Sequence, residues 1–393
     1  MLYKDLCMPS KSFRLKGYSF MAHITRLPPP LPAHFLMHTD TNTDDDDVYS
    51  EASFGFDAAS GIASSHTSHQ DVSMRSASPT PSVMSVSSSF RAQAYKHEFG
   101  RGLNNYSEVY RLPADDEELE RLDSQHVMFK EIMGNYHPKM AEVMADNVPG
   151  EPKAILDLGC GSGMWIMDAA KDFPNCSAVA VDLVPMQSLH MPPNLRSEVD
   201  DINLGLEHFY GDFNVVHSRL ISSGIKDYAG LIDHIAFVLR PGGIIDLMEY
   251  DFHVYDEHHR RVEVDTNTIA GPWWARWMAF ANDAARKRGG DVDAATHLYS
   301  WVKNHPMFEQ VEYREFWIPC SPWKRDFPRH LSMIMRDDIL AFSKAGRPLL
   351  LGNGVPDDVV RELEVNLERE QKAASQRHFV RLQCVWALKK QIT

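Results

Sequence analysis

The sequence predicts an α/β fold in which helices cover both faces of a parallel sheet, and three observations predict it. Short apolar runs alternate along the chain with helix-length segments. Most of these runs are largely apolar, as is typical of strands that are buried on both faces. One run passes directly into a glycine-rich turn at residues 159–163, and this turn opens a helix.

The elements are expected in the following order. A helix begins at the acidic run 115–120, because acidic side chains favour a helix N-terminus, and it ends near Gly134. Strands are then expected over residues 154–158, 178–183, 195–199, 213–217 and 244–248, with helices over 164–171 and 228–239. A long helical region, about 262–288, follows the fifth strand. Two last strands, 311–318 and 379–388, flank a helical insertion.

Composition divides the 393 residues into a tail and a domain. Residues 50–89 are rich in serine and poor in large aliphatic residues, and a proline cluster and an acidic run precede them, so we expect a disordered tail over 1–94 ahead of a domain over 95–393. A net charge of −14 opposes direct nucleic-acid binding. No apolar run has the length of a membrane span, and five scattered cysteines fit a reducing compartment. We therefore expect no membrane partner and a cytoplasmic or nuclear location, or both.

The glycine loop carries the strongest functional signal. Gly159, Gly161 and Gly163 alternate between a strand and a helix, and Asp157 stands two residues before the first. Such glycines let the backbone approach a ligand closely. A dinucleotide fingerprint needs glycine or alanine at its sixth position, which is Met164 when counted from Gly159. S-adenosylmethionine carries an ammonium and a sulfonium group and no phosphate, so a nearby carboxylate favours it. The loop predicts this methyl donor, with a dehydrogenase as the distant alternative.

Carboxylates after the next two strands complete the expected donor site. Asp182 ends the second strand, where its carboxylate can accept hydrogen bonds from both ribose hydroxyls. Asp200 and Asp201 follow the third strand, where a carboxylate can accept from the adenine amino group while Ile202 and Leu183 enclose the ring. A solvated turn remains the alternative for the two aspartates.

Taken together, these motifs resemble those of class I S-adenosylmethionine-dependent methyltransferases. The resemblance rests on residues 156–163, 181–182, 199–202, 213–219 and 239–243. Residues 110–115, 121–126 and 318–323 narrow it to the fungal LaeA-like family. The resemblance implies a Rossmann-like, seven-stranded sheet with an N-terminal helical lid and a helical insertion before the last strand. One departure is Asn214, where the family usually has aspartate.

Catalytic candidates must lie at the carboxyl ends of strands, where open α/β sheets bind ligands. Methyl transfer depends chiefly on positioning and on excluding water, so it needs no acid or base signature. His217 can take a proton from the acceptor or hydrogen-bond near the methionine end of the donor. Glu249, at the end of the fifth strand, is the second catalytic candidate.

The helix over 115–134 has one apolar face and must bury it. We expect it to form a lid with Arg121 or His126 directed toward the donor; packing on the back of the sheet is the alternative. Trp273 and Trp277 share a helix face that either stacks an aromatic substrate or belongs to the core. No metal site is expected, because the histidines of residues 253–259 fit no ligand motif.

The expected function is methyl transfer from S-adenosylmethionine to a small molecule of secondary metabolism or to a protein. The resemblance also implies an alternative, in which the protein is a LaeA-like nuclear regulator of secondary metabolism that acts mainly through regulatory protein partners.

Overall fold

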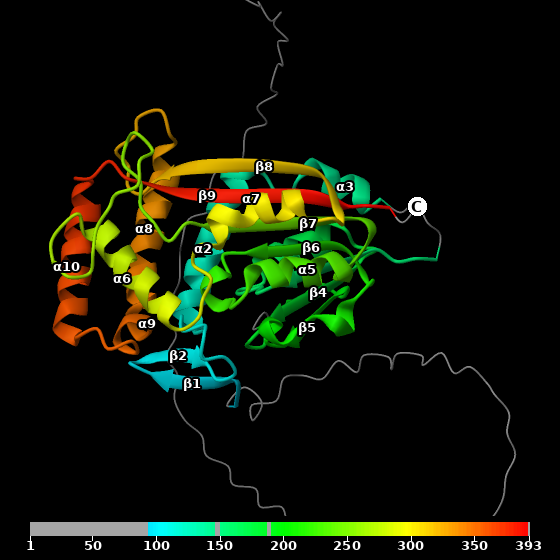
Figure 1. Cartoon of the computed structure of the whole chain (residues 1–393), viewed down its shortest axis with the longest axis horizontal. Helices are drawn as coiled ribbons and strands as arrows, with labels where there is room; N and C mark the ends of the chain where they lie inside the picture. Colours follow the sequence, from blue (N-terminus) through cyan, green and yellow to red (C-terminus); the bar gives the residue numbers. More distant parts are fainter. Residues whose placement is uncertain (1–92, 146–149, 187–189, 392–393) are drawn as a thin grey trace, which may run out of the picture. The chain divides into compact units, whose positions relative to one another are not determined.

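The computed structural model describes residues 93–145, 150–186 and 190–391, which lie in one compact unit (Figure 1). The expected disordered tail lies outside the described residues, apart from Gln93 and Ala94. These two residues are bound to Asn105, whose side-chain amide donates to Gln93 O and whose backbone N–H donates to Ala94 O. The domain boundary near residue 95 stays a prediction.

A seven-stranded sheet forms the centre of the described chain, in the order β5-β4-β3-β6-β7-β9-β8 (Figure 1). The five parallel strands are β3 (Ala154–Leu158), β4 (Ser177–Asp182), β5 (Leu195–Val199), β6 (Phe213–Arg219) and β7 (Leu239–Tyr250). The last strand, β9 (Phe379–Lys389), is antiparallel to both β7 and β8 (Phe308–Pro319). The sheet is therefore parallel over its first five strands and mixed at one edge.

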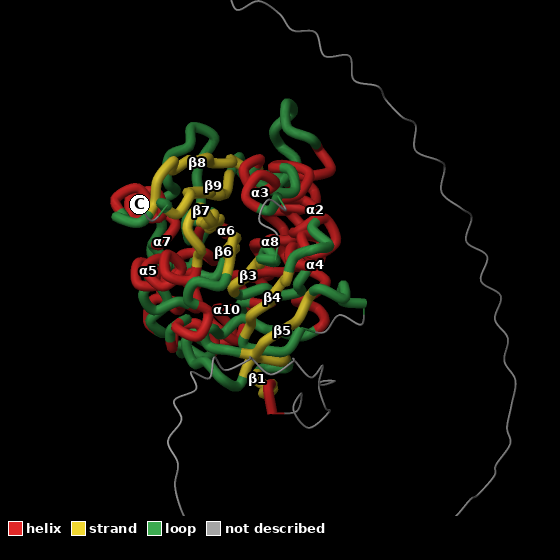
Figure 2. Tube along the Cα trace, turned by 90° about the vertical axis from the view of Figure 1, so that its right-hand side faces the viewer, coloured by secondary structure: helices red, strands yellow, loops and turns green. Residues whose placement is uncertain are grey.

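Helices cover both faces of this sheet, as the side view shows (Figure 2). One face carries α2 (Asp116–Met133), α3 (Pro138–Val143) and α4 (Met164–Asp172), and the other carries α5 (Tyr228–Val238) and α7 (Ala294–Asn304). Successive strand residues point to opposite faces. Ile155 and Ile244 accordingly join the core under α2 and α4, whereas Leu156 and Ile245 join the core under α5 and α7.

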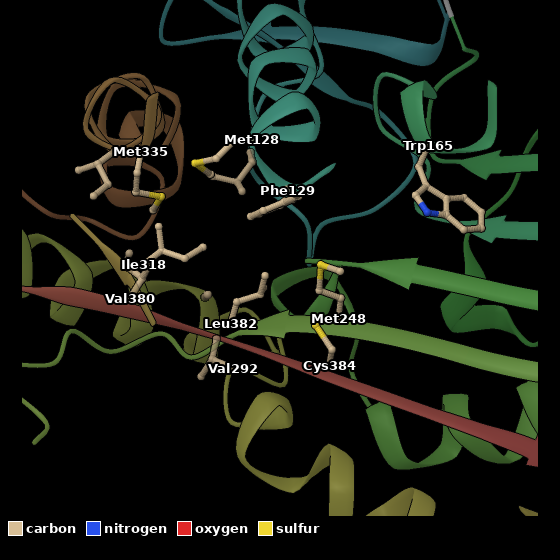
Figure 3. Close-up of a cluster of buried hydrophobic side chains, with 14 of the residues drawn as sticks. Met128, Phe129, Trp165, Met248, Val292, Ile318, Met335, Val380, Leu382 and Cys384 are labelled. Atoms are coloured by element: carbon tan, nitrogen blue, oxygen red, sulfur yellow. The ribbon is translucent and has the colours of Figure 1, made fainter. Parts of the chain in front are cut away.

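The predicted insertion before the last strand is confirmed. It consists of α8 (Arg329–Ala345), α9 (Arg347–Leu351) and α10 (Asp357–Ala373), which pack with α6 (Trp273–Lys287) beside the sheet (Figure 1). Figure 3 shows Met335 of α8 and Met128 of α2 above Ile318 of β8, all in one buried cluster. The insertion thereby shares the core of the sheet.

Some elements differ from the sequence expectation. The region 262–288 is helical only from Trp273, because Pro272 cannot continue a helix toward its N-terminal side and stands at the N-cap of α6. A hairpin of β1 (Tyr95–Glu98) and β2 (Arg101–Asn104), together with α3 and α7, was not expected. Short 3-10 helices, η1 (Ile202–Leu204), η2 (Glu207–Phe209) and η3 (Ser222–Gly224), complete the described elements.

Candidate functional site

One pocket lies at the carboxyl ends of the parallel strands, where open α/β sheets bind ligands. Eleven of the residues predicted for the site line it: Arg121, Asp157, Gly159, Gly161, Asp182, Leu183, Asp200, Asp201, Ile202, His217 and Glu249. Gly163 and His126 do not line it. The sequence therefore located the pocket, and the two exceptions have local reasons.

Gly163 and His126 are both held away from this pocket. Gly163 is the N-cap of α4 with φ at 77°, and a Cβ there would lie 2.3 Å from Met186 Sδ. It serves the turn and the packing beneath it. His126 lies 3.2 Å from Asp168 Oδ2 through its Nε2 and lines a second cavity. Because Asp168 of α4 fixes the imidazole there, the expectation that His126 faces the donor is corrected.

The glycine loop is pressed between α2 and the turn after β6. Gly159 and Gly161 have φ at 71° and 56°, values that favour glycine. A Cβ on Gly161 would lie 2.9 Å from Leu122 Cδ1 of α2, and a Cβ on Gly159 would lie 2.5 Å from Ile221 Cγ2. The loop therefore forms a narrow cradle that any side chain would fill.

Asp157, which is buried, and Asp182, which is half-buried, place two carboxylates beside this cradle. Asp182 Oδ2 accepts from the Gly161 backbone N–H at 2.8 Å. Burial raises the pKa of Asp182 to about 6, although backbone donors including Gly161 oppose the shift. Burial also raises the pKa of Asp157, although the neighbouring His217 and Arg219 side chains oppose the shift. A cationic or hydroxyl-bearing ligand would stabilise the ionised form of both carboxylates.

Asp200 and Asp201 make contacts with other residues in and near the turn after β5. Asp200 Oδ2 lies 3.4 Å from His208 Nε2, and the Asp200 backbone N–H donates to Asp182 O. Asp201 caps η1 by accepting from both the backbone and the side chain of Asn203. Asn203 was not predicted, yet it lines the pocket. Only a three-dimensional arrangement identifies it, because its side chain also bonds to Gly224 O across the pocket wall.

His217 belongs to a polar row that crosses three strands. Asp157, His217 and Asp246 are paired in register on β3, β6 and β7, so their side chains share one face. His217 Nδ1 lies 3.1 Å from Asp246 Oδ2, and the Trp165 ring stacks on the imidazole at 3.7 Å between centroids. Nε2 has no hydrogen-bond partner in the described part of the chain. When the Nδ1–H group donates to Asp246 Oδ2, Nε2 of the neutral imidazole carries no proton and is left as an acceptor.

Glu249 is buried and supports the turn after β6. Its Oε1 accepts from the backbone N–H groups of Ile221 and Ser222, at 2.9 and 3.2 Å, and from the Tyr228 hydroxyl at 3.1 Å. Burial raises the pKa of Glu249 to about 7. These contacts hold Ile221 against Gly159, which gives Glu249 the geometry of a positioning residue.

The roof of the pocket joins α2 to the inserted helix α8. Arg121 pairs with Glu118 at 2.6 Å and with Asp338 of α8 at 2.7 Å. Gln125 also donates to Asp338 at 3.1 Å. Because Arg121, Leu122 and Gln125 all line the pocket, the N-terminal half of α2 covers the glycine cradle.

The far end of the pocket is apolar and comes mainly from α6, α8 and β9. It is lined by Phe252, Trp274, Met278, Met335, Ile339, Phe342 and Val380. Trp277 is fully buried in the core and stacks on Trp274, which forms the wall in its place. Helical spacing predicted an aromatic face, but it could not tell which tryptophan meets the pocket, because that depends on where α8 packs.

Comparison with known proteins agrees with this geometry. Residues 129–305 match the family described as a methyltransferase domain. The secondary metabolism regulator laeA of Coprinopsis cinerea is 50% identical over 295 residues, which cover 74% of this chain and 73% of that protein. The chain belongs to the LaeA-like family of S-adenosylmethionine-dependent methyltransferases.

One further relative and one solved structure that is similar in fold carry methyltransferase names. Methyltransferase pytC of Aspergillus terreus is 30% identical over 247 residues, covering 62% of this chain and 71% of that protein. A solved phosphoethanolamine N-methyltransferase 2 of Haemonchus contortus, with S-adenosylhomocysteine bound, is 16% identical, covers 68% of this chain and 58% of that one, and has a TM-score of 0.36.

Asn214, which stands where the LaeA-like family usually has aspartate, has a structural role. Asn214 Oδ1 accepts from the Ala154 backbone N–H and from Arg240 Nη1, both at 3.0 Å, near the start of β3 and away from the pocket. In the described part of the chain, no three histidine, cysteine or acidic residues form a metal-binding group. Among these residues there is also no helix that is long and apolar enough to cross a membrane.

Proposed function

We propose that the protein transfers a methyl group from S-adenosylmethionine to a hydroxyl or amine of a small, largely apolar molecule. The observation that carries this proposal is a single pocket with a polar end and an apolar end. The polar end holds the glycine cradle with Asp157 and Asp182, and the apolar end is closed by α2 and α8. This division matches a charged donor beside an apolar acceptor.

The donor residues have distinct proposed roles. S-adenosylmethionine supplies an activated methyl group on a sulfonium. Asp157 faces its ammonium, Asp182 accepts from the ribose hydroxyls, and Asp200 or Asp201 accepts from the adenine amino group between Leu183 and Ile202. Arg121 holds the roof in place through Asp338, and the roof excludes water from the reacting atoms.

We assign the proton-accepting role to His217. Asp246 orients the imidazole and leaves Nε2 free to accept a proton from the acceptor. His217→Gln separates this role from donor binding. If His217 is the base, the His217→Gln variant should lose a factor of about 100 or more in kcat, and its affinity for S-adenosylhomocysteine should stay unchanged. A loss of affinity with unchanged kcat would assign it to the donor's methionine end.

The second candidate function is regulation of secondary metabolism through protein partners, in the nucleus, the cytoplasm or both. The 50% identity to a protein named as such a regulator favours it. On this alternative, the acceptor is a protein or the donor site serves little turnover. The acidic net charge opposes direct binding to nucleic acid, so neither candidate function is proposed to act through such contact.

One experiment tests both candidates. The purified full chain is incubated with methyl-labelled S-adenosylmethionine and extract of the source cells, and label is followed into small metabolites, proteins and the chain itself. Label in small molecules supports the proposed function. Label in one protein supports the second candidate. If the chain binds the donor and no label moves, the methyl-transfer proposal fails.

A further inference from the structure

A second cavity lies behind the donor pocket, and the proposed function leaves most of it unused. It is enclosed by the C-terminal half of α2, the turn into α3, and strands β6 to β9. Its volume of about 150 Å³ is that of a cavity that accepts one benzene-sized ring. Trp165, His217 and Arg219 line both cavities, so a ligand here would lie next to the donor.

Flat aromatic side chains form much of the second cavity. Phe129 and Tyr136 come from the helical side, Phe316 and Trp386 come from the sheet, and Trp165 closes the side that faces the donor. Figure 3 shows Phe129 projecting from α2 toward Met248 of the sheet, another lining residue. A planar ring is the shape that such walls accommodate best.

The charge of the lining favours an anion. Among the described residues, Arg219 contacts the Phe129 ring and His126 Nδ1, and Arg314 contacts the Trp386 ring. Neither guanidinium forms an ion pair with a described carboxylate. Lys130, the third cation of the lining, is already paired with Asp168 at 2.7 Å. Two lining guanidiniums that form no ion pair with the described residues offer strong, directional donors to an anionic ligand.

Asp246 adds a specific requirement. It is the carboxylate that lines this cavity, and its side chain is 9% exposed. Its Oδ2 bonds to His217, while Oδ1 has no partner in the described chain. Buried acceptors of this kind are normally satisfied. A ligand that donates a hydrogen bond would satisfy Oδ1.

We propose that the second cavity binds a small hydroxy-aromatic carboxylate as an accessory ligand beside the donor. The ring lies among the aromatic walls, the carboxylate pairs with Arg314 and Arg219, and the hydroxyl donates to Asp246 Oδ1. This site goes beyond the proposed function and does not depend on it, since neither Asp246 nor Arg314 lines the donor pocket.

Calorimetry on the full chain tests the proposal with 4-hydroxybenzoate as the probe. We expect saturable binding both without and with saturating S-adenosylhomocysteine. The uncharged 4-hydroxybenzamide and the hydroxyl-free benzoate should each bind about tenfold more weakly or worse, because each loses one class of hydrogen bond. Arg314→Gln should weaken the binding of 4-hydroxybenzoate by about tenfold and leave the affinity for S-adenosylhomocysteine unchanged.

Arg361→Gln is the matched control, because Arg361 is an exposed arginine of α10 that pairs with Asp357 and lies outside the cavity. It should leave probe binding unchanged. Absence of probe binding, equal binding by the Arg314→Gln variant, or displacement of the probe by S-adenosylhomocysteine would overturn the proposal. The titration with S-adenosylhomocysteine alone tests the donor site, so failure of the two proposals can be told apart.

Discussion

Arg121 and Asp338, 217 residues apart in the chain, form a buried ion pair at 2.7 Å over the donor pocket. Their side chains are only 8% and 5% exposed. Arg121 also pairs with Glu118 on its own helix, and its guanidinium lies over the Phe342 ring of α8. This pair is where the N-terminal helix and the insertion meet, so it fixes the roof that both segments build.

The first prediction concerns the stability that this pair supplies. Asp338→Ala leaves the Arg121 guanidinium buried with one partner fewer and removes the acceptor for Gln125. Breaking a buried pair in this way costs about 3 kcal/mol, because the remaining charge stays desolvated. We expect a loss of that size in the free energy of unfolding, measured by urea denaturation.

Glu368→Ala is the control for this measurement. Glu368 pairs with Lys372 on the surface of α10, with side chains that are 49% and 64% exposed. Exposed pairs contribute at most about 1 kcal/mol. If this variant and Asp338→Ala lose the same stability, the buried Arg121–Asp338 pair does not stabilise the roof more than an exposed pair would.

The second prediction separates two effects of replacing a glycine of the cradle: the loss of space for a ligand and the strain of a left-handed backbone. Gly161→Ala places a Cβ 2.9 Å from Leu122 Cδ1, so the Leu122 side chain must move and the new methyl group takes up space in the glycine cradle. Gly289→Ala has the same left-handed strain, with φ at 91°, but its Cβ would meet nothing within 4 Å. Each substitution costs about 1 kcal/mol of stability. Calorimetry should show loss of S-adenosylhomocysteine binding for Gly161→Ala alone; equal affinity of the two variants would contradict this account.

The sequence predicted the sheet well because its buried strands and glycine loop are local signals. The strand over 154–158, the start of α4 at Met164 and the acids that line the pocket all follow from residues close together in the chain. The helix ending at Gly134 was equally readable, since Asp115 caps it and acidic residues fill its first turn.

What the sequence could not provide are the contacts between distant segments. Asp338 closes the roof, and Asp246 orients His217, but nothing near either residue in the sequence marks that role. His126 lies on the same helix as Arg121 and yet contacts Asp168, because two residues five positions apart on an α-helix point in directions about 140° apart. Such pairings depend on packing and register, which composition and periodicity do not determine.

The third prediction uses the raised pKa of Asp182. The Asp182 carboxyl has a pKa of about 6 without a ligand. Hydrogen bonds from ribose hydroxyls would favour its ionised form. Affinity for S-adenosylhomocysteine should therefore rise as pH increases through about 6 and then level off. Asp182→Asn should bind about tenfold more weakly and lose this rise. Calorimetry between pH 5 and 8 checks it, and an identical pH profile for the variant would assign the titration to another group.

The last prediction concerns Glu249, whose pKa burial raises from its ordinary value of 4.5 to about 7. Between these values the unfolded chain is ionised while the folded chain keeps the proton, so stability falls as pH rises from 4.5 to 7. The shift corresponds to about 3 kcal/mol over that range. Glu249→Gln cannot ionise, but its amide oxygen can still accept from the Ile221 and Ser222 backbones. Urea denaturation at both pH values should show the variant gaining stability over the wild type by up to that amount as pH rises. A constant difference between the two proteins would mean that Glu249 is already ionised in the folded state, and that its three donors outweigh its burial.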